Sequence, residues 1–252
     1  QGLLLIGMKS AKRPPSTDHP LGHGKAVYFW SFLVALMLFS VGGAFSIYEG
    51  VHKLGHPEPL RRAWIAVAVL TFGVVAEAGS MWGCLHEVNK ARGKRSLWRW
   101  FRESRQSELI VIFGEDLAAL LGLVFALVAV LLTIVTGEPI FDAIGTLAIG
   151  VLLVVIAVFI GIEVKALLIG QSVDIELRDE IRAFIEERPE VVRLFNLITL
   201  QLGPDVMVSI KAEMRHDLSA AGLIQAINAV EHALRARFPE IRWSFFEPDA
   251  SD

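Results

Sequence analysis

The chain has 252 residues, of which 54% are hydrophobic and 20% charged, and its formal net charge at pH 7 is −3. This composition is more apolar than that of an ordinary soluble domain, and the absence of a basic excess argues against a nucleic-acid partner. A single cysteine, Cys84, excludes an internal disulfide framework and a cysteine-rich zinc site.

Four apolar segments are each long enough to cross a bilayer, which takes about 20 residues. An apolar stub, Leu3–Met8, precedes them and is too short to span anything. A short turn at 137–139 joins the last two segments, which predicts a helical hairpin. The predicted spans are Tyr28–Tyr48, Trp64–Cys84, Leu109–Val135 and Ile144–Leu168.

Lysine and arginine gather on one side of these spans. They occur before the first span and are dense in the loop between Lys90 and Arg105. The opposite side has only Lys53, Arg61 and Arg62 in one loop and none in the turn at 137–139. The positive-inside rule therefore places the N-terminal end, the basic loop and the C-terminal tail in the cytoplasm. We expect an integral membrane protein that contacts lipid, in a bacterial inner (plasma) membrane.

Charge becomes dense after residue 172, which predicts a transmembrane domain over 1–172 and a cytoplasmic α+β domain over 173–252. The alternation of Val206, Val208, Ile210 and Ala212 with polar residues indicates a strand with one buried face. Asp217 or Ser219 is expected to cap the second helix. The predicted order is helix Ile175–Glu187, strands Val191–Leu202 and Asp205–Glu213, a helix ending at Phe238, and strand Ile241–Phe246.

Acidic residues inside the second and third spans are the main functional signal. A charge at the bilayer centre costs from about 2.5 to more than 10 kcal/mol, so such a residue usually faces a partner, a polar cavity or an ion path. Glu115 and Asp116 are adjacent in the third span, and Glu77 lies in the second. Adjacent helical positions point about 100° apart, so Glu115 and Asp116 do not face one ion equally. For Asp116, the alternative to ion binding is a carboxylate satisfied by a neighbouring hydroxyl or backbone group.

Several segments in combination resemble the cation diffusion facilitator family. They are 18–25 (DHPLGHGK) before the first span, 48–54 (YEGVHKL) with 56–59 (HPEP) at its end, and Asp116 among small residues. The resemblance implies a six-helix transporter, of which this chain holds helices three to six and the end of helix two, followed by a ferredoxin-like α-β-β-α-β domain. It also implies a homodimer, held partly through that domain, which exports a divalent cation in exchange for protons. On this view the chain is N-terminally incomplete, is not an enzyme and needs no cofactor beyond the transported ion.

The predicted ion site departs from the family pattern. The resemblance aligns Asp116 with the aspartate of a His-x-x-x-Asp pair, but Ile112 stands where the histidine is expected. We therefore expect Asp116, Glu115 and Glu77 as metal ligands in a divergent branch. Oxygen ligands favour harder ions, so manganese, iron(II) and cobalt are alternatives to zinc, the expected cation.

Histidines outside the spans form a second group of candidates. Asp18, His19 and His23 are expected either to feed ions to the cytoplasmic entrance or to belong to a polar loop. His216 and His232 are possible metal ligands of the C-terminal domain or ordinary surface residues.

Two other functions were weighed from the sequence. A non-transporting membrane regulator or metal sensor would keep the fold with a degenerate site, as the missing histidine suggests. A metalloenzyme or an ATP-driven pump is disfavoured, because the sequence holds neither His-Glu-x-x-His nor a phosphate-binding Gly-x-x-x-x-Gly-Lys loop.

Overall fold

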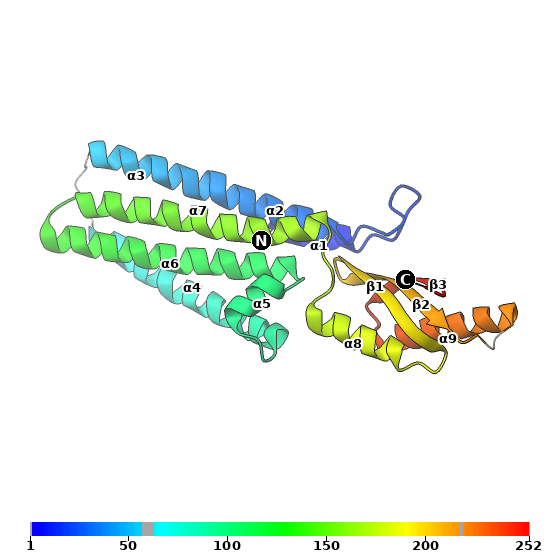
Figure 1. Cartoon of the computed structure of the whole chain (residues 1–252). Coiled ribbons are helices and arrows are strands. Elements are labelled where there is room, and N and C mark those ends of the chain that lie inside the picture. Colours follow the sequence, from blue (N-terminus) through cyan, green and yellow to red (C-terminus); the bar gives the residue numbers. More distant parts are fainter. Residues whose placement is uncertain (1, 57–62, 217–218, 252) are drawn as a thin grey trace. The chain divides into compact units, whose positions relative to one another are not determined.

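The computed structural model describes residues 2–56, 63–216 and 219–251 (Figure 1). The chain forms two compact units. The helical unit comprises Gln1–Leu5 and Phe29–Lys165, and the sheet unit comprises Ile6–Tyr28 and Ala166–Asp252. The segment before the first span is grouped with the C-terminal domain, and the expected division at residues 172 and 173 stays a prediction.

The helical unit confirms four membrane-length helical segments of 30 residues each. The first, Ala26–Gly55, consists of α2 (Ala26–Met37), a π-helical stretch η1 (Leu38–Ala44) and α3 (Phe45–Gly55). The others are α4 (Ala63–Arg92), α6 (Ser107–Thr136) and α7 (Ile140–Ile169). Each extends beyond the predicted apolar segment, because helical backbone continues into polar residues until a stop signal. Gly137, in the left-handed conformation at φ 77°, is that signal after α6.

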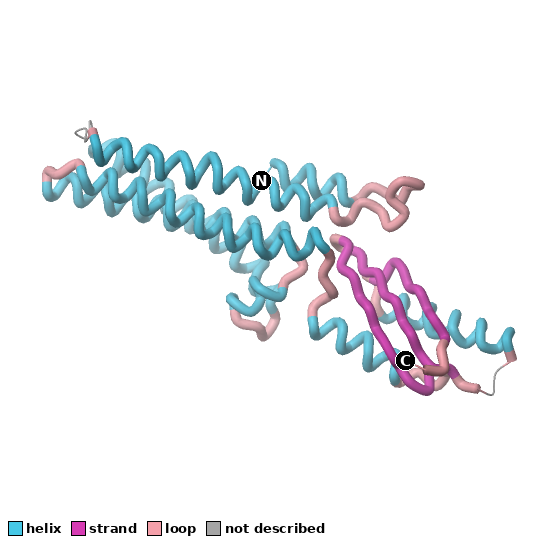
Figure 2. Tube along the Cα trace, turned by 45° about the horizontal axis from the view of Figure 1, so that its top comes forward, coloured by secondary structure: helices cyan, strands magenta, loops and turns pink. Residues whose placement is uncertain are grey.

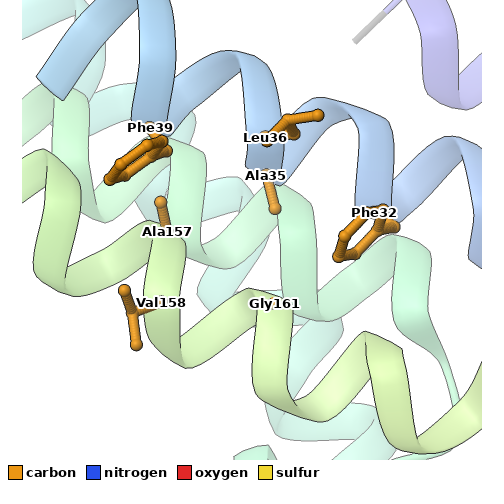
Figure 3. Close-up of a pocket in the computed structure, with 7 residues that line it drawn as sticks. All are labelled: Phe32, Ala35, Leu36, Phe39, Ala157, Val158 and Gly161. Carbon is orange, nitrogen blue, oxygen red and sulfur yellow. The ribbon is translucent and has the colours of Figure 1, made fainter. Parts of the chain in front are cut away.

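The long helices pack side by side, with α6 between α7 and α4 (Figure 1). Close approach depends on glycine where the first span crosses α7. A Cβ added to Gly150 would lie 2.7 Å from the backbone nitrogen of Ile47. Farther along, Figure 3 shows an apolar groove between these helices, lined by Phe32, Ala35, Leu36, Phe39, Ala157, Val158 and Gly161.

The predicted basic loop contains a short helix, α5 (Leu97–Glu103), that sequence inspection did not identify. Ser96 caps it by accepting a hydrogen bond from the amide of Arg99 at 3.2 Å. Trp100 is buried and meets Phe113 of α6 edge-on, whereas Trp98 remains 61% exposed. The apolar positions of this loop therefore anchor it to the bundle.

The sheet unit confirms the ferredoxin-like α-β-β-α-β order. Its elements are α8 (Ile175–Glu186), β1 (Val191–Leu202), β2 (Asp205–Met214), α9 (Ala220–Arg237) and β3 (Ile241–Pro248). The strand order is β1-β2-β3, with β1 antiparallel and β3 parallel to β2. Ser219 caps α9 as predicted, and Asp217, the alternative cap, lies outside the described residues.

Both helices of this unit cover the same face of the sheet (Figure 2). The core joins Ile181 and Ile185 of α8, Val230 and Leu234 of α9, and the buried face of β2. The predicted alternation in β2 is confirmed: Val206, Val208, Ile210 and Ala212 are buried, and the residues between them are partly exposed. The periodicity of apolar residues in the sequence was therefore sufficient to predict which face of β2 is buried.

The segment before the first span docks on the β1–β2 turn. The amide of Gly203 donates a hydrogen bond to the hydroxyl of Tyr28 at 2.9 Å. Gly24 faces the same turn, where an added Cβ would overlap the carbonyl oxygen of Leu202. These contacts explain why residues 6–28 belong to the sheet unit.

Candidate cation-binding site

Asp116 of α6 lies in the interior of the helical unit and is only 3% exposed. Its Oδ2 accepts a hydrogen bond from Ser80 Oγ of α4 at 3.2 Å. Small residues beside it, Gly114 and Ala118, are also buried and let neighbouring helices approach. Asp116 is thus buried, and it also has a neighbouring hydroxyl partner. Such a partner was the expected alternative to ion binding for this carboxylate.

One face of α4 presents polar groups to this carboxylate. Glu77, Ser80 and Cys84 follow one another at helical spacings of three and four, which places them on one side of the helix. Glu77 is close enough to interact electrostatically with Asp116 and Glu115, and Cys84 interacts with Asp116. Glu77 of α4 therefore lies near the two adjacent carboxylates of α6.

The acidic residues do not converge on one point. Among the described residues, no three His, Cys, Asp or Glu side chains are close enough to hold a metal ion together. Glu115 is half-buried and, as the next residue in α6, points about 100° away from Asp116. A common ligand set of Asp116, Glu115 and Glu77 stays a prediction.

Ile112, at the position of the expected histidine, packs against an apolar cluster. Cys84, Val88, Trp100 and Ile110 form the buried part of this cluster. In the sequence, Cys84 served only to exclude a disulfide framework and a cysteine-rich zinc site. The spacing of Cys84 from Glu77 and Ser80 was the signal for its place beside Asp116.

An ion pair near the start of α6 was missed from the sequence. Arg102 Nη1 of α5 donates to Glu163 Oε1 of α7 at 2.7 Å, and the Glu163 side chain is only 9% exposed. Glu163 lies within the fourth apolar segment, so its position in that run was itself a detectable signal. The pair fixes α5 to the end of α7.

A second ion pair joins the first span to α7. Lys53 Nζ of α3 lies 2.9 Å from Asp142 Oδ2 and 3.4 Å from Thr146 Oγ1. Asp142 belongs to the first turn of α7, so this contact lies where α6 has ended and α7 begins.

The structure brings together two of the three residues proposed at the cytoplasmic entrance. The ring centres of His19 and His23 are 4.4 Å apart, and His23 Nδ1 is buried without a hydrogen-bond partner among the described residues. Asp18 is exposed. A role of these residues in ion binding stays a prediction.

The proposed C-terminal ligands have different surroundings. His216 Nε2 lies 2.7 Å from Glu213 Oε1, and His232 is exposed on α9. After β3, hydrogen bonds from the Ala250 amide and from Lys211 hold the pKa of Asp249 below its usual range. Asp249 is thus engaged in a local structural contact.

Comparison with known proteins gives a consistent family. The family described as "Cation efflux transmembrane domain" matches residues 1–169. The chain is 31% identical over 219 residues to the human "Proton-coupled zinc antiporter SLC30A9, mitochondrial", covering 86% of this chain and 38% of that protein. It is 27% identical to "Metal tolerance protein C4" of Arabidopsis thaliana, covering 81% of this chain and 45% of that protein.

A bacterial relative is matched over a larger share of its length. The chain is 25% identical over 245 residues to "Cation-efflux pump FieF" of Klebsiella pneumoniae, covering 93% of this chain and 73% of that protein. These relatives are named for transport or metal tolerance, and none of the three is named as an enzyme. With its four membrane-length helices and its small α+β domain, the chain is an integral membrane protein that belongs to the cation diffusion facilitator family.

Proposed function

We propose that the chain exports a divalent metal cation across a membrane in exchange for protons, with zinc as the expected cation. The observation that carries this proposal is the burial of Asp116 within the helical unit, beside Glu77 across the interface of α4 and α6. An acidic residue in a membrane span is costly and marks a functional path in many transporters. The relatives named as a proton-coupled zinc antiporter and a cation-efflux pump support the same activity.

Proton exchange follows from the same acidic groups. A carboxylate that binds a cation must be deprotonated, so protons compete with the cation for its oxygens. Protons arriving from the far side would release the ion, and their departure toward the cytoplasm would restore the site. Manganese, iron(II) and cobalt stay open as alternatives because the predicted ligands are oxygen atoms.

The test compares cation flux in proteoliposomes containing the wild-type chain, Asp116→Asn or Glu87→Gln. Asp116→Asn keeps the size of the side chain and removes its charge, so we expect loss of zinc flux. Glu87 is an exposed carboxylate on the same helix as Glu77 and pairs with Lys90 at 2.8 Å, so it is the matched control and should retain flux. Equal flux through the wild type and Asp116→Asn would refute the proposal.

A dye that reports lumenal pH tests the exchange in the same vesicles. Zinc movement should be accompanied by an opposite proton movement that Asp116→Asn abolishes. Parallel assays with manganese, iron(II) and cobalt would rank the cations. Flux without any pH change would contradict antiport while leaving export intact.

A membrane regulator or metal sensor is the second candidate. Ile112 at the expected histidine position and the lack of a three-residue cluster among the described residues favour it. It predicts metal binding without flux in the wild-type chain. The flux assay therefore separates the two functions.

A homodimer formed partly through the sheet unit is proposed as well. Ile198, Ser209 and Phe245 align across β1, β2 and β3 on the face opposite the helices. Ile198 and Phe245 are more than half exposed, which leaves an apolar row for a second copy to cover. Ile198→Glu should lower the mass measured by light scattering in detergent, whereas Ile224→Glu on exposed α9 should not. An unchanged mass in Ile198→Glu would exclude this surface as the contact.

Orientation and location stay predictions. The basic segments support a cytoplasmic C-terminal domain. The matched relatives include a protein named as mitochondrial and another from a bacterium, so the bacterial inner membrane is untested.

A further inference from the structure

Two histidines four residues apart lie at the end of α3: His52 belongs to its last turns, and His56 is the non-helical residue that caps it. The ring centres of His52 and His56 are 5.1 Å apart, and their planes differ by 24°. Tyr48 stacks on His52 one turn earlier, with ring centres 6.4 Å apart. All three side chains are exposed, so no other described part of the chain covers the two imidazoles.

The spacing of this pair suits metal ligation. Histidines four residues apart on a helix are the arrangement that binds one zinc ion in His-Glu-x-x-His sites. Zinc lies about 2.0–2.1 Å from each ligating nitrogen, so two rings on a tetrahedral ion have centres about 5 Å apart. The observed 5.1 Å equals that spacing, and the two stacked rings must turn so that each aims one nitrogen at a shared ion.

The charged residues near the pair in residues 2–56 and 63–216 are Lys53, which is already paired, and Glu49. Lys53, between the two histidines in sequence, is held against Asp142 at 2.9 Å and Thr146 at 3.4 Å. Glu49 lies three residues before His52 and shares its side of the helix. Among the described residues, Lys53 is therefore paired with α7, and an acidic residue accompanies the imidazoles.

The pair is remote from Asp116. The contact of Lys53 with the first turn of α7 places the end of α3 beside the start of α7 (Figure 1). Asp116 lies about 20 residues before the end of α6, which corresponds to about 30 Å along that helix at about 1.5 Å per residue. Binding at the two places can be measured separately.

We propose that His52 and His56 form a two-imidazole site for a borderline divalent transition metal such as Zn²⁺, Ni²⁺ or Cu²⁺. Imidazole selects these ions over Mg²⁺ and Ca²⁺, which prefer oxygen ligands. Water completes the coordination because both side chains are exposed. The site does not rest on the proposed transport, since binding is measured on the solubilised chain.

The test uses Cu²⁺ as the probe, in a parent variant that lacks the other closely stacked histidine pair, His19→Ala/His23→Ala. Two daughters each lose two more histidines. One removes His52 and His56, and the other removes His86 and His232, which are exposed but not neighbours in sequence. Electron paramagnetic resonance reports imidazole nitrogen bound to Cu²⁺, and titration gives the number of equivalents.

The parent and the His86→Ala/His232→Ala daughter should bind one equivalent with nitrogen coupling. The His52→Ala/His56→Ala daughter should lose that equivalent or bind it at least tenfold more weakly. The His52→Gln/His56→Gln variant keeps polar side chains at both positions and serves as the folding control. It should show the same loss of Cu²⁺ binding. Equal nitrogen-coupled binding in both daughters, or none in the parent, would overturn the proposal and leave the pair as stacked interface residues.

Discussion

Removal of the Arg102 guanidinium should destabilise the helical unit, because it leaves the Glu163 carboxylate without its partner. Breaking a buried ion pair costs about 3–5 kcal/mol, whereas an exposed pair contributes about 0.2–1 kcal/mol. Glu163 is 9% exposed and Arg102 is 51% exposed, so the pair lies between these limits. Arg105 also interacts with Glu163 and offsets part of the loss. We expect Arg102→Ala to reduce the free energy of unfolding by about 1.5–3 kcal/mol.

The matched control is an ion pair on the same short helix. Arg99 bonds Glu103 at 2.9 Å, but these side chains are 54% and 29% exposed. Arg99→Ala should therefore cost less than about 0.5 kcal/mol. Unfolding in detergent can be followed by tryptophan fluorescence, since Trp98 and Trp100 both lie on α5.

A double-mutant cycle with Glu163→Gln isolates the interaction. Glu163→Gln removes the buried charge, so the subsequent loss of Arg102 should cost much less than it does in the wild type. We expect a coupling energy of about 1–2 kcal/mol, which is within the range for contacting residues. Equal destabilisation by Arg99→Ala and Arg102→Ala, or a coupling energy near zero, would show that the Arg102–Glu163 pair does not stabilise the helical unit.

Two further substitutions test packing and docking. Gly150→Ala brings a Cβ within 2.7 Å of the Ile47 backbone and should lower the free energy of unfolding by about 1–3 kcal/mol. Gly161→Ala, in open space on the same helix, should raise it by about 0.5–1 kcal/mol. Melting midpoints that move in the same direction in both variants would contradict this. Tyr28→Phe removes the hydroxyl that accepts the hydrogen bond of the Gly203 amide and should lower stability by about 1 kcal/mol. The loss should be seen as faster hydrogen exchange at that amide. Tyr48→Phe, at an exposed tyrosine, should leave the exchange rate unchanged. Equal exchange in both variants would show that the Tyr28 contact does not protect the amide.

Local patterns predicted most of the secondary structure. The spans were detected because apolar length is a property of consecutive residues, and the buried face of β2 because Val206 to Ala212 alternate. The helix α5 was missed because dense arginine obscured the cap at Ser96 and the buried Trp100. The docking of residues 6–28 was missed because it depends on Tyr28 reaching Gly203, far along the chain.

The candidate site was predicted less completely than the fold. Asp116 was identified because a carboxylate in an apolar run is conspicuous, and its burial was confirmed. Its partner Ser80 was not identified, since serine is common in membrane helices and only the packing of α4 on α6 brings the two together.

By itself, the sequence determined the membrane class, the number of long helices, the order of elements in the C-terminal domain and the family resemblance. Each depends on periodicity or on short motifs, which neighbouring residues encode directly. The tertiary structure alone decided the ion pairs of Lys53 with Asp142 and of Arg102 with Glu163, and the grouping of Glu77, Ser80 and Cys84 around Asp116. These contacts join different helices, and helix packing selects which of many polar residues meet.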